Sequence, residues 1–322
     1  MMKRLLLKIK KPLLLSLFTA LTLSMLLESE KAFSLSLAGL NLWFEKMIPT
    51  LLPFMILSGI LIRMNLSDSF ARLFAPLLRP VFRLSDSCLY VLVIGFLCGF
   101  PMGARVTAES LQHGKLSKRE ASLMLAFCNN IGPIYFSGFV LTLFPAAKPL
   151  PFWAGMYLLP LLYGLFLRRM VYRDIPCPVP AAGRCVLSSA SRASSALSGR
   201  SLMAQTQEAV TSALVSQASL GGYMILFNLM NLLPDLFLPA KAVLPRALCG
   251  CLLEITGGLS RLDPSDAFWA FVLLPFGGLS CIFQTYSMIR ETDLSLRQYV
   301  LHKCIQTLLA FLYYTALFPV LF

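Results

Sequence analysis

The segment GFLCGFPMGARVTAE, residues 95–109, decides the fold of this 322-residue chain. It starts inside an apolar run and ends among polar residues, and helix-breaking residues cluster in its middle: Gly95, Gly99, Pro101 and Gly103. Such a break leaves backbone N–H and C=O groups unpaired, and lipid cannot satisfy them, so the segment must face protein or a watery cavity. We therefore expect a re-entrant helical hairpin over about residues 89–114, in place of an ordinary membrane crossing.

The composition around this segment is that of a membrane protein. Hydrophobic residues make up 57% of the chain and charged residues 13%, and the mean hydropathy is +0.73. Soluble domains carry about 25% charged residues. Because a helix needs about 20 apolar residues to cross a bilayer, we expect an all-α polytopic membrane protein with a single membrane domain.

A second break follows the hairpin. The apolar stretch over about 120–144 is long enough to cross a membrane, but it contains Asn-Asn-Ile-Gly-Pro at residues 129–133. Proline removes a backbone donor and disfavours helix at the residue before it. We therefore expect a broken transmembrane helix here.

The second half of the chain repeats this order. A short apolar stretch over about 243–262 is interrupted by Glu-Ile-Thr-Gly-Gly at 254–258, which predicts a second re-entrant hairpin. The next apolar stretch, about 267–289, contains Pro-Phe-Gly-Gly at 275–278, which predicts a second broken helix.

These features divide the chain into repeats. Residues 1–35 are expected to form an N-terminal membrane helix, because Glu-Ser-Glu-Lys at 28–31 offers no signal-peptide cleavage site after the first apolar run. The first repeat is expected over 36–167 and the second over 207–322. Between them, residues 168–206 are rich in Ser, Ala and Arg, which indicates a flexible basic cytoplasmic linker.

The formal net charge of +13 would suggest nucleic acid in a soluble protein. Here the basic residues flank apolar runs or lie on an expected amphipathic interfacial helix over 65–86, so we expect no nucleic-acid partner. A cytoplasmic N-terminus places most Lys and Arg, Lys303 included, on the cytoplasmic side, as the positive-inside rule requires. The two hairpins then enter from opposite faces, which predicts an inverted repeat. The basic residues left outside are Lys31, Lys46, Lys148, Lys241, Arg246 and Arg261.

Paired, interrupted apolar segments in two inverted halves indicate a transporter's binding site near the middle of the membrane. Helix ends exposed at such breaks can hold an ion or a charged solute. The alternative is simple kinking, because Gly and Pro are frequent in membrane helices. The candidate substrate-binding residues are Gly99, Pro101, Gly103, Arg105, Asn129, Asn130, Gly132, Thr256, Gly257 and Gly277.

Four of the polar residues each leave two roles open. Glu254 is an acidic residue deep in an apolar segment, where a charge is costly; it predicts a coupling-ion or proton site, or a hydrogen bond that ties the hairpin arms together. Arg105 lies four residues before Glu109, so it either forms an intrahelical ion pair or serves the solute. Asn129 and Asn130 either offer amide ligands or cap the break.

The sequence offers no catalytic constellation. The nine cysteines form no CxxC pair, and the two histidines cannot assemble a metal or catalytic cluster. No pair of acids and no Ser/His or Cys/His set lies at comparable depth, so an enzyme is not expected. We expect no cofactor and no metal; a coupling ion, Na⁺ or H⁺, remains open.

Four motifs together resemble the YlbJ family of sporulation integral membrane proteins. They are GFLCGFPMGARVTAE at 95–109, SKREA at 117–121, FCNNIGP at 127–133 and LEITG at 253–257. This family belongs to the nucleoside-recognition (gate) group, which is related to concentrative nucleoside transporters. The resemblance covers most of the chain from about residue 40. The chain departs from the family at Ile131, where relatives often carry Pro, and in its long linker.

The resemblance implies a multi-pass protein of the bacterial cell membrane, located in the outer forespore membrane of a spore-forming host. There it would move dipicolinic acid from the mother cell during sporulation. Dipicolinate is a small planar dianion, which suits helix N-termini, Arg105 and amide side chains as ligands. A nucleoside or another small solute, and a non-transporting scaffold of a sporulation membrane complex, remain alternatives. The expected partners are a small anionic solute and the lipid bilayer, and a homo-oligomer is left open.

Overall fold

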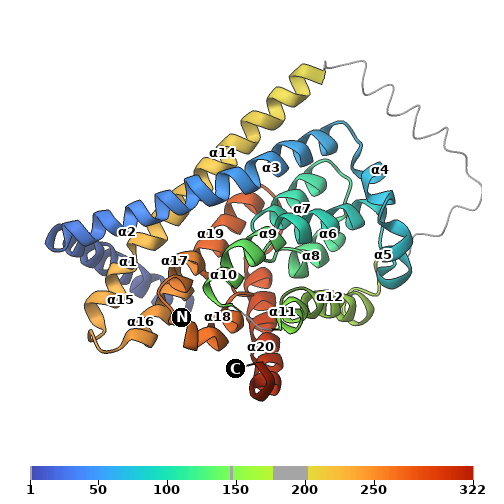
Figure 1. Cartoon of the computed structure of the whole chain (residues 1–322). Helices are drawn as coiled ribbons and strands as arrows, with labels where there is room; N and C mark the ends of the chain where they lie inside the picture. The colour runs from blue at the N-terminus through green and yellow to red at the C-terminus, as the bar shows by residue number, and fades with distance from the viewer. Residues whose placement is uncertain (1, 146–147, 177–201, 322) are drawn as a thin grey trace, which may run out of the picture.

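The computed structural model describes residues 2–145, 148–176 and 202–321. In these residues every regular element is a helix and none is a strand (Figure 1), which confirms the all-α class. Five helical stretches are long and apolar enough to cross a membrane, and a bent helix pair brings the number to six. The five stretches are Ser29–Arg63, Pro149–Met170, Leu202–Phe237, Pro264–Ile289 and Leu296–Pro319.

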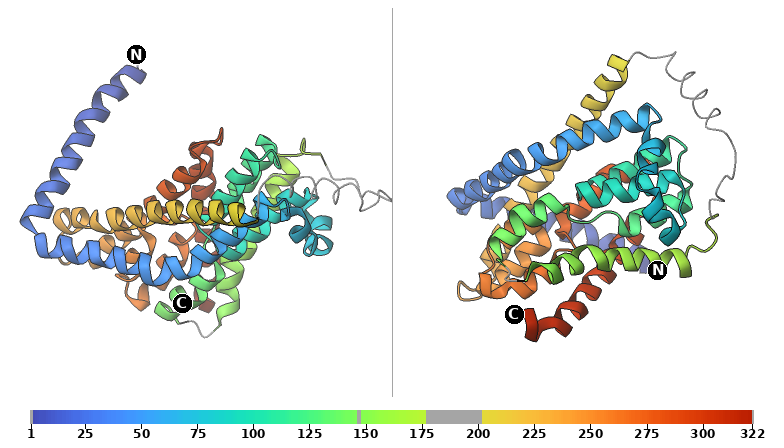
Figure 2. Two further views of the ribbon diagram at one scale, coloured as in Figure 1. Left: turned by 90° about the horizontal axis from the view of Figure 1, so that it is seen from above. Right: turned by 45° about the vertical axis from the view of Figure 1, so that its right-hand side comes forward.

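Two long helices lie side by side along the upper edge of the molecule in Figure 1. One is continuous through α2 (Ser29–Asn41), the π-helical turn η1 (Leu42–Met47) and α3 (Ile48–Arg63); the other is α14 (Leu202–Leu229). A Cβ on Gly39 would lie 2.9 Å from the Cα of Ile225, so a glycine permits the close approach. The N-terminal α1 (Met2–Leu27) projects away from the bundle (Figure 2, left) and contacts α2 and α15 (Leu232–Phe237).

The segment expected as an amphipathic helix over 65–86 contains two short helices, α4 (Ser67–Arg72) and α5 (Ala75–Phe82). Leu73 and Leu77 are about three-quarters exposed there, whereas Phe82 is buried. A segment with some apolar side chains exposed and others buried against the bundle is typical of chain that lies at a membrane surface.

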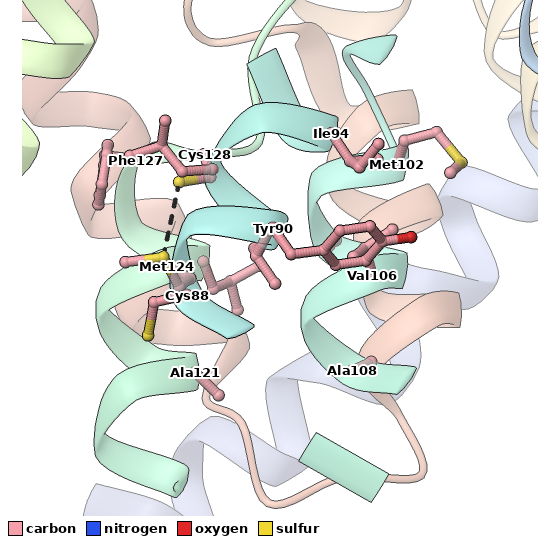
Figure 3. Close-up of a cluster of buried hydrophobic side chains, with 14 of the residues drawn as sticks. Cys88, Tyr90, Ile94, Met102, Val106, Ala108, Ala121, Met124, Phe127 and Cys128 are labelled. Atoms are coloured by element: carbon pink, nitrogen blue, oxygen red, sulfur yellow. Dashed lines mark hydrogen bonds between the residues drawn. The ribbon is translucent and has the colours of Figure 1, made fainter. Parts of the chain in front are cut away.

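Helix α6 (Asp86–Cys98) leaves α5 at an angle of 106°. It packs against α7 (Met102–Gln112), its partner in the hairpin, and α8 (Lys118–Phe127). Figure 3 shows side chains of the three helices interleaving, among them Tyr90 from α6 and Val106 from α7. The hairpin is thus a packed unit, buried on nearly every side of α6.

The chain is interrupted after α8. The next helix starts at Pro133 and runs through α9 (Pro133–Tyr135), η2 (Phe136–Val140) and α10 (Leu141–Leu143). A further crossing comprises α11 (Pro149–Trp153), η3 (Ala154–Leu158) and α12 (Leu159–Met170). Most of the expected linker, residues 177–201, lies outside the described residues, and α14 already begins at Leu202.

The second half has the same order of elements. After α14 and α15 come the paired helices α16 (Val243–Leu253) and α17 (Ile255–Leu259), and the turn η4 (Pro264–Asp266). An interrupted pair follows, α18 (Ala267–Leu273) and α19 (Gly278–Ile289), and the chain closes with α20 (Leu296–Leu321). Each half therefore presents a helix pair and then an interrupted helix; their inversion across the membrane stays a prediction.

Candidate solute-binding site

The tip of the first hairpin touches the first helix break through glycine. Gly99 has φ +83°, and a Cβ there would lie 2.2 Å from the backbone N of Gly132. A Cβ on Gly103 would lie 2.2 Å from the carbonyl O of Cys128. Pro101 lies at the tip between them, in the N-cap position of α7, and its carbonyl accepts a hydrogen bond from the backbone N–H of Arg105. Only residues without a side chain allow the two interrupted backbones to meet here.

Asn129 connects this contact to the second half of the chain. Its side chain is fully buried, and its Oδ1 accepts a hydrogen bond from the backbone N–H of Ala104 at 3.2 Å. Its Nδ2 donates to Thr285 Oγ1 at 2.9 Å and to Tyr299 OH at 3.1 Å. The amide thus caps an unpaired N–H of α7 and joins α7 to α19 and α20.

Asn130 is the acceptor for a buried cation. Lys303 on α20 is fully buried and donates to Asn130 Oδ1 at 2.8 Å and to Gln306 Oε1 at 3.1 Å. Its Nζ also lies 4.7 Å from the centre of the Phe100 ring. Lys303 is therefore held inside the bundle, because Asn130, 173 residues earlier in the chain, and the nearby Gln306 supply acceptors that stabilise the ammonium there. Its side of the membrane stays a prediction.

The second tip is organised by Glu254. Its carboxylate accepts hydrogen bonds from the backbone N–H groups of Thr256 at 3.2 Å and Gly257 at 2.7 Å. Asn228 of α14 donates to the same carboxylate at 3.2 Å through Nδ2. Glu254 is only 2% exposed. It therefore joins the second arm of the helix pair to α14 and caps the amides at the break.

Two contacts bring the halves together. Tyr135, directly after the first break, donates its hydroxyl to Thr256 Oγ1 at 3.1 Å. Gly277, with φ +76°, lies where a Cβ would be 3.1 Å from the Phe100 ring. All four interruptions of the helices are thus neighbours in space.

These interruptions surround a small cavity, which we call the central pocket. Its volume is about 60 Å³. Apolar residues of α3 and α14 cover one side of it, and the polar lining comes chiefly from the breaks and α19: Gly132, Tyr135, Glu254, Thr256 and Gln284. Phe100 also lines the pocket and so separates it from Lys303.

The structure distributes the candidate residues over three settings. Gly132, Glu254 and Thr256 line the central pocket. Arg105 lies elsewhere, in a larger cavity between α7, α14 and α19. The remaining candidates pack or hydrogen-bond around the breaks without lining the central pocket: Gly99, Pro101, Gly103, Asn129, Asn130, Gly257 and Gly277.

Arg105 forms the intrahelical ion pair that its spacing allows, with Nε 3.0 Å from Glu109 Oε1. Its Nη2 donates to Ser212 Oγ of α14 at 3.1 Å. The cavity that it lines measures about 600 Å³, and we call it the polar chamber.

Sequence reasoning missed Asn228, Tyr135 and Lys303 as members of the site. Asn228 and Asn231 interrupt the apolar run of α14 and could have been singled out as polar residues at depth. Tyr135 carried no local signal, because its role depends on Thr256 in the other half of the chain.

Comparison with known proteins finds one family model and one curated protein similar to this chain. Residues 44–144, which contain the first hairpin and the first break, match the family model described as Gate, nucleoside recognition. The sporulation integral membrane protein YlbJ of Bacillus subtilis is 28% identical, over 93% of this chain and 80% of its own length. The chain is similar to YlbJ over most of its length. This confirms the resemblance that the four motifs predicted.

No solved structure matches the chain. The match to YlbJ, whose name describes an integral membrane protein, and the apolar helices together indicate a multi-pass membrane protein. Among the described residues no three His, Cys, Asp or Glu side chains gather in a way that could hold a metal ion.

Proposed function

We propose that the chain is a secondary transporter that moves a small organic anion, with dipicolinic acid as the candidate solute, across the outer forespore membrane during sporulation. The observation that carries the proposal is the central pocket, where four helix interruptions from both halves meet around polar groups. The name of the relative YlbJ supports the link to sporulation. The motif resemblance supports dipicolinate.

The pocket's electrostatics suggest how transport could be coupled. Glu254 brings a carboxylate into the lining, and it repels an arriving anion unless a cation accompanies the solute. A proton or Na⁺ bound at Glu254 would remove that repulsion. The buried cation of Lys303 lies 4.7 Å from the centre of the Phe100 ring, which lines the pocket. Cation and anion would then favour each other's binding, which is the coupling that a secondary transporter requires.

The proposed cycle is alternating access by two inverted halves, with the N-terminus in the cytoplasm. Ligand pockets for small molecules usually measure about 300–1,000 Å³, so a central pocket of about 60 Å³ must widen to admit a planar dicarboxylate. The contacts between Tyr135 and Thr256 and between Gly277 and Phe100 lie where the halves would separate.

A nucleoside is the second candidate solute, because the family matched by residues 44–144 is described by nucleoside recognition. The hydroxyl and amide groups of Tyr135, Thr256 and Gln284 could hydrogen-bond a sugar or a base as well as a carboxylate. The two solutes differ in charge, so competition experiments separate them.

The test is uptake of radiolabelled dipicolinate into proteoliposomes that contain the purified chain. We expect saturable uptake driven by an inward Na⁺ or H⁺ gradient, and competition by unlabelled dipicolinate but not by uridine. Glu254→Gln removes the charge and keeps the shape, so uptake should lose its gradient dependence or cease while the protein still inserts. Competition by uridine would favour the nucleoside, and no uptake of either solute by folded protein would contradict transport.

A further inference from the structure

Resting on the proposed function, we infer that the polar chamber is a second solute site, at which a carboxylate is captured before it enters the central pocket. The chamber lies between α7, α14 and α19, which pack together (Figure 1). Its volume of about 600 Å³ falls within the range of small-molecule pockets, which the central pocket does not reach.

The guanidinium of Arg105 is the capturing group. The side chain is 3% exposed and lines the chamber. Its Nε and Nη2 are held by Glu109 and Ser212, but its Nη1 has no hydrogen-bond partner among the described residues although it is buried. A guanidinium keeps its charge and all five donors at any physiological pH. A buried donor without an acceptor is costly, so the site is complete only when a ligand supplies one.

Glu109 orients this group and leaves part of it available. It occupies the Nε edge of the guanidinium through Oε1, and its Oε2, like Arg105 Nη1, is buried without a hydrogen-bond partner among the described residues. A carboxylate would bind the end formed by Nη1 and Nη2 in the two-pronged geometry that Arg favours, in place of the Ser212 contact. Ser212 and its neighbour Thr211 contribute hydroxyl groups to the same wall. The ligand class that fits is a small carboxylate with further acceptors for these hydroxyls.

The charges that face the chamber come in opposite pairs. Arg63 lies 3.9 Å from Glu208, and Arg290 lies 3.3 Å from Glu291. These two pairs are partly exposed at the chamber wall, whereas the Arg105 pair is the buried one. Because no strong net field fills the chamber, the unpartnered donor at Arg105 rather than bulk charge confers the preference for an anion.

The chamber and the central pocket share two lining helices. On α14, Ser216, Ser219 and Tyr223 line the chamber, and the adjacent Leu220 and Met224 line the central pocket. On α19 the order is Ser287 in the chamber and Gln284 in the central pocket.

The capture site is tested by equilibrium dialysis of dipicolinate against the purified full chain in detergent. We expect Arg105→Gln to weaken binding at least tenfold. The matched control is Arg119→Gln, which also removes one positive charge but from an exposed ion pair with Asp174 outside the chamber; its binding should stay within twofold of the wild type. Pyridine-2,6-dicarboxamide, the uncharged analogue, should bind the wild type at least tenfold more weakly than dipicolinate.

The outcomes separate the two proposals. Unchanged binding by folded Arg105→Gln, or equal binding of the dicarboxamide, overturns the capture site even if transport is intact. Arg105-dependent binding without transport supports the capture site and overturns the transporter. If Arg105→Gln does not fold, Arg105→Lys decides, because it keeps the charge and loses the planar fork; binding as tight as in the wild type would then overturn the site.

Discussion

At the scale of single residues, the chain keeps a few polar side chains deep in the bundle by giving each one partners from distant segments. Asn129, Asn130 and Lys303 are all completely buried, and their bonds join the first break to α19 and α20. A window of sequence around Lys303 shows a basic residue near the start of a helix and nothing more. Its partner Asn130 lies 173 positions away, which is why the local sequence gives no sign that Lys303 is buried.

The pairing of Lys303 with Asn130 can be tested by a double-mutant cycle. Asn130→Leu leaves the buried ammonium without its nearer acceptor, and we expect a loss of stability of about 1–3 kcal/mol. Adding Lys303→Met removes the stranded charge and should restore part of that loss, because apolar replacement of a buried polar pair is often nearly neutral. Thermal unfolding in detergent measures both. A double variant less stable than Asn130→Leu alone would show that Lys303 has another essential partner.

At the scale of elements, the interruptions could be predicted and the contacts between them could not. Gly and Pro carry a local signal, and the structure interrupts its helices where GFPMG and NNIGP stand in the sequence. Glu254 caps the amides of Thr256 and Gly257. This contact depends on the backbone geometry of the break, which residue propensities for helix or turn do not predict. Arg105 was foreseen as either an ion pair or a solute ligand, and the ion pair is present.

Helix α8 begins with a capping box whose contribution should depend on pH. Ser117 Oγ accepts from the backbone N–H of Glu120, and the Glu120 carboxylate accepts from the backbone N–H of Ser117 and from Ser85 Oγ. Burial raises the pKa of Glu120, but the hydrogen bonds from Ser117 and Ser85 outweigh it and hold the pKa below its ordinary value of 4.5. The carboxylate is therefore more stable in the folded protein than in the unfolded chain.

The sign of the effect follows from that lowered pKa. The folded protein binds the Glu120 proton less readily than the unfolded chain, so the stabilisation is complete above about pH 5 and is lost as the pH falls below 4.5 through the folded-state pKa. The melting temperature of wild type should exceed that of Glu120→Gln at pH 7, and the difference should shrink toward pH 3. A difference that stays constant from pH 7 to pH 3 would mean that the charge is irrelevant to the cap.

At the scale of the whole molecule, composition alone predicted a helical membrane protein, and the structure confirms that class with five apolar stretches of spanning length. The way in which the two halves enclose one pocket was beyond local patterns, because it depends on contacts such as Tyr135 with Thr256, 121 positions apart. Only the order of the breaks, repeated in both halves, suggested that they would meet.

The hydroxyl of Tyr135 forms a direct hydrogen bond from the first break to Thr256 at the second tip. Tyr135→Phe should therefore weaken the contact that holds the two halves together around the central pocket. A buried hydrogen bond contributes about 0.5–1.5 kcal/mol, which corresponds to an opening equilibrium up to about tenfold larger. Amide hydrogen exchange in peptides that contain residues 254–258 should accelerate by up to that factor.

Tyr157→Phe is the matched control for this prediction. Tyr157 belongs to the same aromatic cluster around Phe136, and its buried hydroxyl has no hydrogen-bond partner among the described residues. Removing an unpaired buried hydroxyl costs no hydrogen bond, so exchange at residues 254–258 should stay at the wild-type rate or become slower. Equal acceleration in both variants would indicate general loosening of the aromatic cluster, and no acceleration in Tyr135→Phe would show that the halves are held closed by their glycine contacts and packing instead.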